Sequence, residues 1–174
     1  ITTPMTFCST VNCIVHSGAK PVLVDIKEDT LNIDEDKIEE KITKNTKAIL
    51  IVHFAGLPCN MTKIKKIISK YNLTLIEDCA HAIESKYKGK EVGNFGYSGC
   101  YSFYVNKNIT TCEGGMITTK NKYLNNYIIS NRLHGLSKDA WKRFFPSKQK
   151  KNIYFYDVLE AGYKFNMPDL NASI

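Results

Sequence analysis

Short apolar runs alternate with amphipathic segments along most of the chain. Strand-like length, β-branched or aromatic residues and flanking turn residues mark five runs: 20–26, 47–54, 73–80, 100–104 and 114–119. Helical spacing of apolar residues marks three longer segments: 34–42, 61–72 and 122–135. Strands that alternate with helices predict an α/β fold, with a central, mainly parallel sheet flanked by helices.

Several residues are candidates for the boundaries of these elements. Thr62 is a candidate N-cap of the helix at 61–72, and Gly135 would stop the helix at 122–135. The Gly114–Gly115 pair is expected to turn the chain back before the last strand. Gly89, Gly93 and Gly96 do not form a dinucleotide-binding pattern, so we interpret them as turn glycines.

Length and charge narrow the class of protein. The 174 residues suffice for one domain, and no apolar run approaches the roughly 18 residues of a membrane span, so we expect a cytoplasmic protein without a membrane partner. The net charge is +7, but only Arg132 and Arg143 among the 24 basic residues are arginines. Base and phosphate recognition favours the arginine fork, so we expect no nucleic-acid partner.

The six cysteines show no metal-binding pattern. They form neither a C-x-x-C motif nor a pair of pairs at zinc-finger spacing. Several lie in apolar runs, where a free cysteine acts as a small buried hydrophobe. Reduced thiols and no metal site are therefore expected.

Polar residues follow the most apolar parts of three predicted strands, which are 47–52, 73–76 and 100–104. These residues are His53, Glu77, Asp78, His81 and Lys107. In open α/β sheets, ligands bind beyond the carboxyl ends of the strands, so an acid, a histidine and a lysine should meet at one edge. For His53 we favour a histidine whose hydrogen bonds are satisfied inside the core.

These residue types suit one cofactor chemistry. A lysine that reacts covalently must be partly neutral, and Lys107 follows a run of aromatic residues that could shield it. In pyridoxal phosphate (PLP) enzymes a carboxylate, here Asp78, pairs with the pyridinium nitrogen. Ser102 could supply a hydroxyl to the phosphate. Phe7 could stack on the ring, although simple core packing is an equally open alternative.

The order of motifs resembles the DegT/DnrJ-type sugar aminotransferases, which are PLP enzymes of the aspartate-aminotransferase fold. The matching pieces are a strand-end Glu-Asp, A-H-A, G-x-x-G-x-x-G, S-F-x-x-x-K, T-T-x-E-G-G and R-x-H-G, in the family's order over essentially the whole chain. The resemblance implies that residues 1–174 are part of a PLP-binding large domain. An N-terminal segment and a small C-terminal domain of the family lie outside this sequence.

The resemblance also implies a role for each site residue. Lys107 would bind PLP covalently and then move a proton between cofactor and substrate, and Asp78 would pair with the pyridinium nitrogen. His81 would lie near the phenolic oxygen, Ser102 would bind the phosphate and Phe7 would stack on the ring.

One further residue connects the site to a partner. Asn166 would reach the phosphate bound by a neighbouring subunit, so the resemblance implies a homodimer. Cys112 lies where the family often has Gly or Ala, and we expect a small residue there without thiol chemistry.

The activity implied by the resemblance is the transfer of an amino group from glutamate to a keto sugar attached to a nucleotide. The segment R-L-H-G-L-S-K-D-A-W-K-R favours a 4-keto-6-deoxy sugar, destined for surface polysaccharide, lipopolysaccharide or a glycoside. Relatives that dehydrate instead carry histidine in place of the lysine, and Lys107 argues against such a dehydratase. Two further hypotheses are a non-catalytic family member that pairs with or regulates a partner, and a basic nucleic-acid-binding module.

Overall fold

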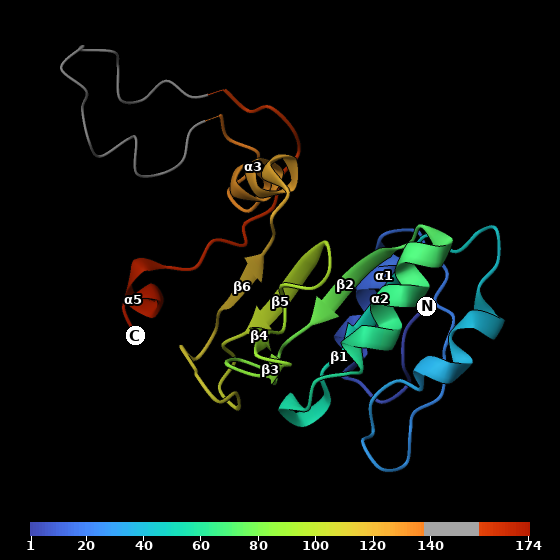
Figure 1. The fold of residues 1–174 in the computed structure, drawn as a ribbon. Helices are drawn as coiled ribbons and strands as arrows, with labels where there is room; N and C mark the ends of the chain where they lie inside the picture. Colours follow the sequence, from blue (N-terminus) through green and yellow to red (C-terminus); the bar gives the residue numbers. More distant parts are fainter. Residues whose placement is uncertain (138–156) are drawn as a thin grey trace, which may run out of the picture. The chain divides into compact units, whose positions relative to one another are not determined.

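The computed structural model describes residues 1–137 and 157–174 (Figure 1). The chain divides into two compact units, one of residues 1–120 with 173–174 and one of residues 121–172. In the described part of the chain, no helix has the length and apolarity that a membrane span requires.

The first unit is built on a four-stranded sheet. Its strands lie in the order β1 (Ala48–Val52), β2 (Thr74–Asp78), β5 (Ser98–Ser102) and β6 (Gly115–Thr118). The first three run parallel, and β6 runs antiparallel to β5. A separate hairpin of β3 (Lys86–Tyr87) and β4 (Lys90–Glu91) lies between β2 and β5 in sequence. The mainly parallel sheet with flanking helices confirms the predicted fold class.

The two faces of β2 meet different helices. Helix α2 (Met61–Tyr71) packs Ile64 into one core cluster with Ile49 and Leu75. Side chains alternate along a strand, so Glu77 shares the face of Leu75, whereas Asp78 points to the other face. There it meets helix α1 (Cys8–His16), and both helices lie beside β1 and β2 (Figure 1).

The register of the strands brings their carboxyl ends together. Val52 of β1 pairs with Asp78 of β2, and Asp78 pairs with Cys100 of β5. The residues that follow these three strands therefore emerge at one edge of the sheet, as predicted.

The predicted strand at 20–26 forms only isolated bridges, so this prediction was wrong in extent. Val22 accepts a hydrogen bond from the Thr2 N–H, and Val24 donates one to the Thr2 carbonyl, both at 2.9 Å. Leu23 bridges Thr2 in parallel. The pairing stops because its partner segment bends away after Pro4, which has no N–H to donate.

The predicted helix at 34–42 is two short 3₁₀ turns, η1 (Glu35–Lys37) and η2 (Glu39–Lys41). Asp34 caps the first turn by accepting the Asp36 N–H at 3.1 Å. Ile38 is fully buried between the turns, and Ile42 already has extended backbone angles. A single buried apolar residue over so short a segment does not sustain an α-helix.

Helix α2 matches the prediction except at its start. The side chain of Asn60, not Thr62, is the N-cap, since it accepts the Lys63 N–H at 3.2 Å. Asn72 ends the helix in the left-handed conformation with φ 50°.

The second unit contains α3 (Lys122–Asn131), a short helix α5 (Asp169–Ala172) and the antiparallel bridges Leu133↔Lys164 and Leu136↔Val158. Helix α3 ends four residues before Gly135, earlier than predicted. Gly135 adopts φ +68°, and a Cβ there would lie 2.1 Å from the Glu160 carbonyl oxygen. This glycine therefore permits a close backbone approach after the helix, and its N–H also donates to the carbonyl of Ser130, in the last turn of α3, at 3.0 Å.

Candidate functional site

Asp78, the last residue of β2, has both carboxylate oxygens engaged. Its Oδ2 accepts the hydroxyl proton of Thr10 at 2.9 Å, and its Oδ1 accepts the Ala80 N–H at 3.0 Å. Asp78 is half-buried, whereas Thr10 is only 3% exposed. Each carboxylate oxygen can accept more than one hydrogen bond, so a ligand can still be bound.

His81 lies near both Asp78 and Lys107. Its ring meets Phe54 edge-on, with centroids 6.3 Å apart. Partial burial lowers the pKa of His81 below its ordinary value, the Lys107 charge lowers it further, and Asp78 acts in the opposite sense. The structure therefore brings three of the predicted site residues into one electrostatic group.

Lys107 lies in the loop between β5 and β6, which is closed by backbone hydrogen bonds. The Phe103 N–H donates to Gly114 at 2.9 Å, the Thr111 N–H donates to Phe103 at 3.0 Å, and the Lys107 N–H donates to Tyr104 at 3.0 Å. Lys107 is half-buried, and none of the residues the structure describes holds its ammonium by a hydrogen bond or ion pair. The lysine head is therefore available to a ligand.

The turn in this loop does not fall on the predicted glycine pair. Cys112 is the residue with positive φ, at 65°, whereas Gly115 already begins β6 and pairs with Ser102. A Cβ at Gly115 would lie 2.8 Å from the Tyr101 carbonyl oxygen. Gly115 is thus required by close strand packing, and the left-handed backbone at Cys112 explains why a small residue suits that position.

Ser102 and Phe7 lie in the same unit as this group. Ser102 follows Cys100, the register partner of Asp78, by two residues on β5. Its Oγ accepts the Tyr104 N–H at 3.3 Å, which leaves its own proton for another acceptor. Phe7 precedes α1 and is 78% exposed, so the core-packing alternative is wrong, while ring stacking stays a prediction.

Asn166 belongs to the second unit, whereas the other predicted site residues belong to the first. It is half-buried, and the Lys164 ammonium donates to its Oδ1. Its contact with a neighbouring subunit stays a prediction.

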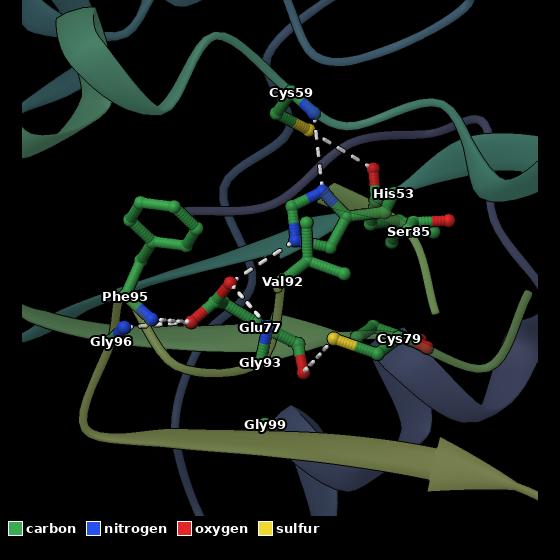
Figure 2. A network of polar contacts seen from close by, with 12 residues as sticks. His53, Cys59, Glu77, Cys79, Ser85, Val92, Gly93, Phe95, Gly96 and Gly99 are labelled. Atoms are coloured by element: carbon green, nitrogen blue, oxygen red, sulfur yellow. Dashed lines mark hydrogen bonds and ion pairs between the residues drawn. The ribbon is translucent and has the colours of Figure 1, made fainter. Parts of the chain in front are cut away.

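Glu77 is the centre of a buried polar network next to this group (Figure 2). It is fully buried, and its Oε1 accepts the N–H groups of Phe95 at 2.8 Å and Gly96 at 2.6 Å. Its Oε2 accepts the Gly93 N–H at 2.8 Å and lies 3.2 Å from His53 Nε2. Glu77 therefore holds the loop that leads into β5.

The histidine of this network has a defined tautomer. The Cys59 N–H donates to Nδ1 of His53 at 3.1 Å, so the neutral ring carries its proton on Nε2 and donates to Glu77. His53 is fully buried, which confirms the core interpretation. Burial raises the pKa of Glu77, but hydrogen bonds from His53, Gly96 and Gly93 outweigh burial, and the pKa is lowered.

Ligand atoms of His53, Glu77 and Cys79 lie within 4.8 Å of one another, a spacing that could hold a metal ion. In this structure, however, the same atoms of His53 and Glu77 are engaged in hydrogen bonds. Both ring nitrogens of His53 and both oxygens of Glu77 are engaged. Burial and the charges of Glu77 and Asp78 raise the pKa of Cys79, so its thiol stays protonated. The cluster is a hydrogen-bond network.

The glycines beside Glu77 permit close packing of β5. Gly93 has φ +76°, and Gly89 has φ +79°, which confirms both as turn glycines. A Cβ at Gly99 would lie 2.4 Å from the Gly93 Cα (Figure 2 places both beside Glu77). Thr118 of β6 also donates to the Gly93 carbonyl at 2.7 Å.

Comparison with protein families gives a match over the whole chain. Residues 1–174 match the DegT/DnrJ/EryC1/StrS aminotransferase family. The chain therefore belongs to this family, and the predicted resemblance is confirmed.

Two curated relatives align with every residue of the chain. An uncharacterised protein of Methanocaldococcus jannaschii, MJ1066, is 52% identical, and the spore coat polysaccharide biosynthesis protein SpsC of Bacillus subtilis is 44% identical. The chain spans 44% of the length of each relative.

Solved structures show the same fold. Helicobacter pylori PseC, an aminotransferase involved in the biosynthesis of pseudoaminic acid, superposes with a TM-score of 0.87 at 32% identity, covering 99% of this chain and 43% of PseC. Spr1654 of Streptococcus pneumoniae in its PLP form superposes with a TM-score of 0.84 at 30% identity, covering 99% of this chain and 46% of Spr1654.

PLP is the cofactor of this family, as expected from the sequence. The donor set at the sheet edge fits it. Asp78 offers a carboxylate that can accept another hydrogen bond, and among the described residues nothing engages the Lys107 ammonium or accepts the hydroxyl proton of Ser102. Thr10 was missed by sequence reasoning, because a threonine early in a helix gives no signal of a partner 68 residues away.

Proposed function

We propose that this chain is the cofactor-binding part of a sugar aminotransferase that moves an amino group from glutamate to a nucleotide-linked keto sugar. The observation that carries the proposal is the group of Asp78, His81 and Lys107 at the carboxyl edge of the sheet. A lysine and a carboxylate that meet at such an edge in a PLP family are the two groups that the cofactor requires.

PLP supplies an electron sink for the carbon that carries the transferred amino group. Asp78 would hold the ring in place, because its carboxylate can accept a hydrogen bond from a protonated ring nitrogen. Ser102 would donate its hydroxyl proton to the phosphate, and Phe7 would cover one face of the ring. His81 would lie near the phenolic oxygen.

Lys107 would bind the cofactor and move the proton. Its Nζ, once released, would take a proton from the α-carbon of the amino donor. The same Nζ would deliver a proton to the sugar carbon in the second half of the reaction. The backbone hydrogen bonds that close the loop from Phe103 to Gly114 support this role, because they would restrain the backbone that carries Lys107.

The names of two relatives support a sugar substrate. SpsC is a spore coat polysaccharide biosynthesis protein, and PseC takes part in the biosynthesis of pseudoaminic acid. We therefore propose a role in surface polysaccharide, lipopolysaccharide or glycoside biosynthesis in the cytoplasm. The 4-keto-6-deoxy sugar is the most specific part of the proposal, and the second half of the segment that favours it, residues 138–143, lies outside the described residues.

A homodimer completes the proposed site. Asn166 of one protomer would reach the phosphate bound by the other protomer. A non-catalytic family member would differ from the enzyme in one property, the specific binding of PLP at Lys107, and cofactor trapping separates the two.

The trapping experiment starts from the purified chain mixed with PLP. Borohydride then reduces a bond between the cofactor aldehyde and a lysine amine to a stable secondary amine. Peptide mapping should find the pyridoxyl group on the peptide that contains Lys107. Lys107→Ala should lose it, whereas Lys120→Ala, which removes an exposed lysine, should retain it.

A pyridoxyl group spread over many lysines, or none at all, would contradict the proposal. A specific adduct at Lys107 would justify assays with glutamate and a series of nucleotide-linked keto sugars. The sugar that is aminated would then identify the substrate.

A further inference from the structure

Two threonine hydroxyls and the Asp78 carboxylate form a chain of hydrogen bonds. Thr10, the third residue of α1, places its Oγ1 2.9 Å from Oδ2 of Asp78. Thr6, just before the helix, places its Oγ1 2.6 Å from Oγ1 of Thr10. Thr10 is 3% exposed and Thr6 is half-buried, so water competes little for the inner hydroxyl.

The chemistry of the acceptor determines which hydroxyl donates in each of these hydrogen bonds. An ionised carboxylate can only accept hydrogen bonds, so Thr10 donates its single hydroxyl proton to Asp78. The oxygen of Thr10 must then accept the proton of Thr6. Both protons point toward Asp78, and each hydrogen bond polarises the next.

The second carboxylate oxygen is held as well. Oδ1 accepts the Ala80 N–H at 3.0 Å, from the chain that follows β2. Two donors on different elements therefore fix the plane of the Asp78 carboxylate, and hydrogen bonds to an ionised acceptor are roughly twice as strong as neutral ones.

We propose that Thr10 is a positioning residue for the cofactor: it holds the ionised Asp78 carboxylate in the plane in which an oxygen meets the ring nitrogen of PLP. Thr6 supports Thr10 by orienting its proton. This inference rests on the proposed function, because it assigns Asp78 to the ring nitrogen. It adds that the first turn of α1 sets the orientation of the Asp78 carboxylate.

The test uses variants that separate the effect of the Thr10 hydroxyl from the effect of the side-chain shape. Thr10→Val keeps the branched shape without the hydroxyl, and Thr10→Ser keeps the hydroxyl without the methyl group. Thr6→Val removes only the outer hydroxyl. Thr118→Val is the control, because it removes a threonine hydroxyl from the same unit that bonds the Gly93 carbonyl instead.

The first measurement is the binding of PLP and the ¹⁵N chemical shift of labelled ring nitrogen in the bound cofactor. Thr10→Val should weaken PLP binding by about 10-fold and shift the ring nitrogen toward its unprotonated value. Thr6→Val should weaken binding by about 3-fold. Thr10→Ser should restore both the affinity and the nitrogen shift, and Thr118→Val should leave both unchanged.

The second measurement needs no cofactor. Hydrogen exchange of the Ala80 amide reports whether the Asp78 carboxylate stays in place, since this amide donates to it. In Thr10→Val the amide should exchange faster than in the unaltered chain, in Thr10→Ser and in Thr118→Val.

The two measurements distinguish the two proposals. If the unaltered chain binds no PLP but Thr10→Val still speeds the Ala80 exchange, the proposed function fails and the positioning of Asp78 by Thr10 stands. If Thr10→Val leaves both the ring nitrogen shift and the Ala80 exchange unchanged, the positioning role is overturned, whatever the affinity for PLP.

Discussion

Glu77 and Asp78 are neighbouring acids on one strand with opposite surroundings. Glu77 is fully buried and accepts hydrogen bonds from His53 and from three backbone N–H groups. Asp78 points to the other face, is half-buried, and accepts one hydroxyl and one N–H. The alternation of a strand thus separates a carboxylate whose hydrogen bonding is complete from one that can still accept.

This difference distinguishes a structural acid from a functional one. A buried carboxylate is stable only when its hydrogen bonds are satisfied, and four donors around Glu77 leave no place for a ligand. Asp78 lies at the strand end, where ligands bind in open α/β sheets, and it can bind one more donor. Stability should therefore depend on the first acid and ligand binding on the second.

The largest expected effect on stability comes from Glu77→Gln. Either orientation of the new amide places its NH₂ group against two N–H donors. The buried network therefore loses the negative charge of Glu77, and donors come to face donors. We expect a loss of about 3–5 kcal/mol in the free energy of unfolding, measured by urea titration followed by circular dichroism.

Asp78→Asn is the matched comparison. Its amide can donate to Thr10, which can reverse its hydroxyl, so we expect a loss of only about 1 kcal/mol. PLP binding should fall in Asp78→Asn. An equal loss of stability in the two variants would show that the two acids do not differ in role.

The next largest effect on stability is expected at Gly93, a donor to Glu77, and Gly89 is its matched control. Gly93 and Gly89 share a left-handed backbone, with φ +76° and +79°. A Cβ at Gly93 would lie 2.3 Å from the Tyr101 hydroxyl oxygen, whereas a Cβ at Gly89 meets nothing within 4 Å. Gly89→Ala should cost about 1 kcal/mol of unfolding free energy through its backbone alone.

Gly93→Ala adds a steric clash to the same backbone cost, so we expect a total loss of about 3 kcal/mol. Urea titration of both variants measures the difference. Equal losses would mean that the Tyr101 ring moves aside freely and that the packing around Gly93 is loose.

The pH dependence of stability should report the ionisation of Glu77 in its buried network. The pKa of Glu77 is lowered from its ordinary value of 4.5. A lowered acid pKa adds stability that is complete above the ordinary pKa and is lost as the pH falls through the lowered one. The stability difference between the unaltered chain and Glu77→Gln should therefore be constant at neutral pH and shrink below about pH 4.5.

Urea titrations from neutral pH down to about pH 3 measure this difference. Exposed acids such as Asp36 and Glu39 titrate in both proteins, so their contribution cancels in the comparison. A difference that stays constant over the whole range would show that Glu77 is not the ionised centre of the network.

Periodicity predicted the sheet well and the short elements poorly. The runs around Ile49, Leu75 and Cys100 form strands because each is apolar and pairs with a neighbouring strand of the same sheet. The run at 20–26 fails because its partner bends away after Pro4, a property of another segment that its own pattern cannot reveal. The turn at Cys112 was missed because glycine is the usual left-handed residue.

The residues of the site were partly predictable. Position after an apolar run identified Asp78, His81 and Lys107, since parallel strands end at one edge. The partners of these residues were not predictable. Thr10 and the N–H groups around Glu77 depend on contacts between distant segments, and such contacts leave no local pattern in the sequence.

The smallest expected effect tests whether Lys107 lies beside His81. The Lys107 charge is the second cause, after partial burial, that lowers the pKa of His81 below 6.5. Lys107→Met should therefore raise this pKa, although it should stay below 6.5 because burial remains. Titration of the imidazole signals by NMR measures the shift, with His81→Gln to assign the signal.

Lys107→Arg is the matched control, since it retains the charge and should keep the pKa low. Asp78→Asn should move the pKa of His81 in the opposite direction to Lys107→Met, because the Asp78 charge raises it. If Lys107→Met and Asp78→Asn both left the pKa unchanged, the three residues would not share one site. That result, which requires no bound cofactor, would contradict the assignment of ligand binding to the Asp78 face of β2.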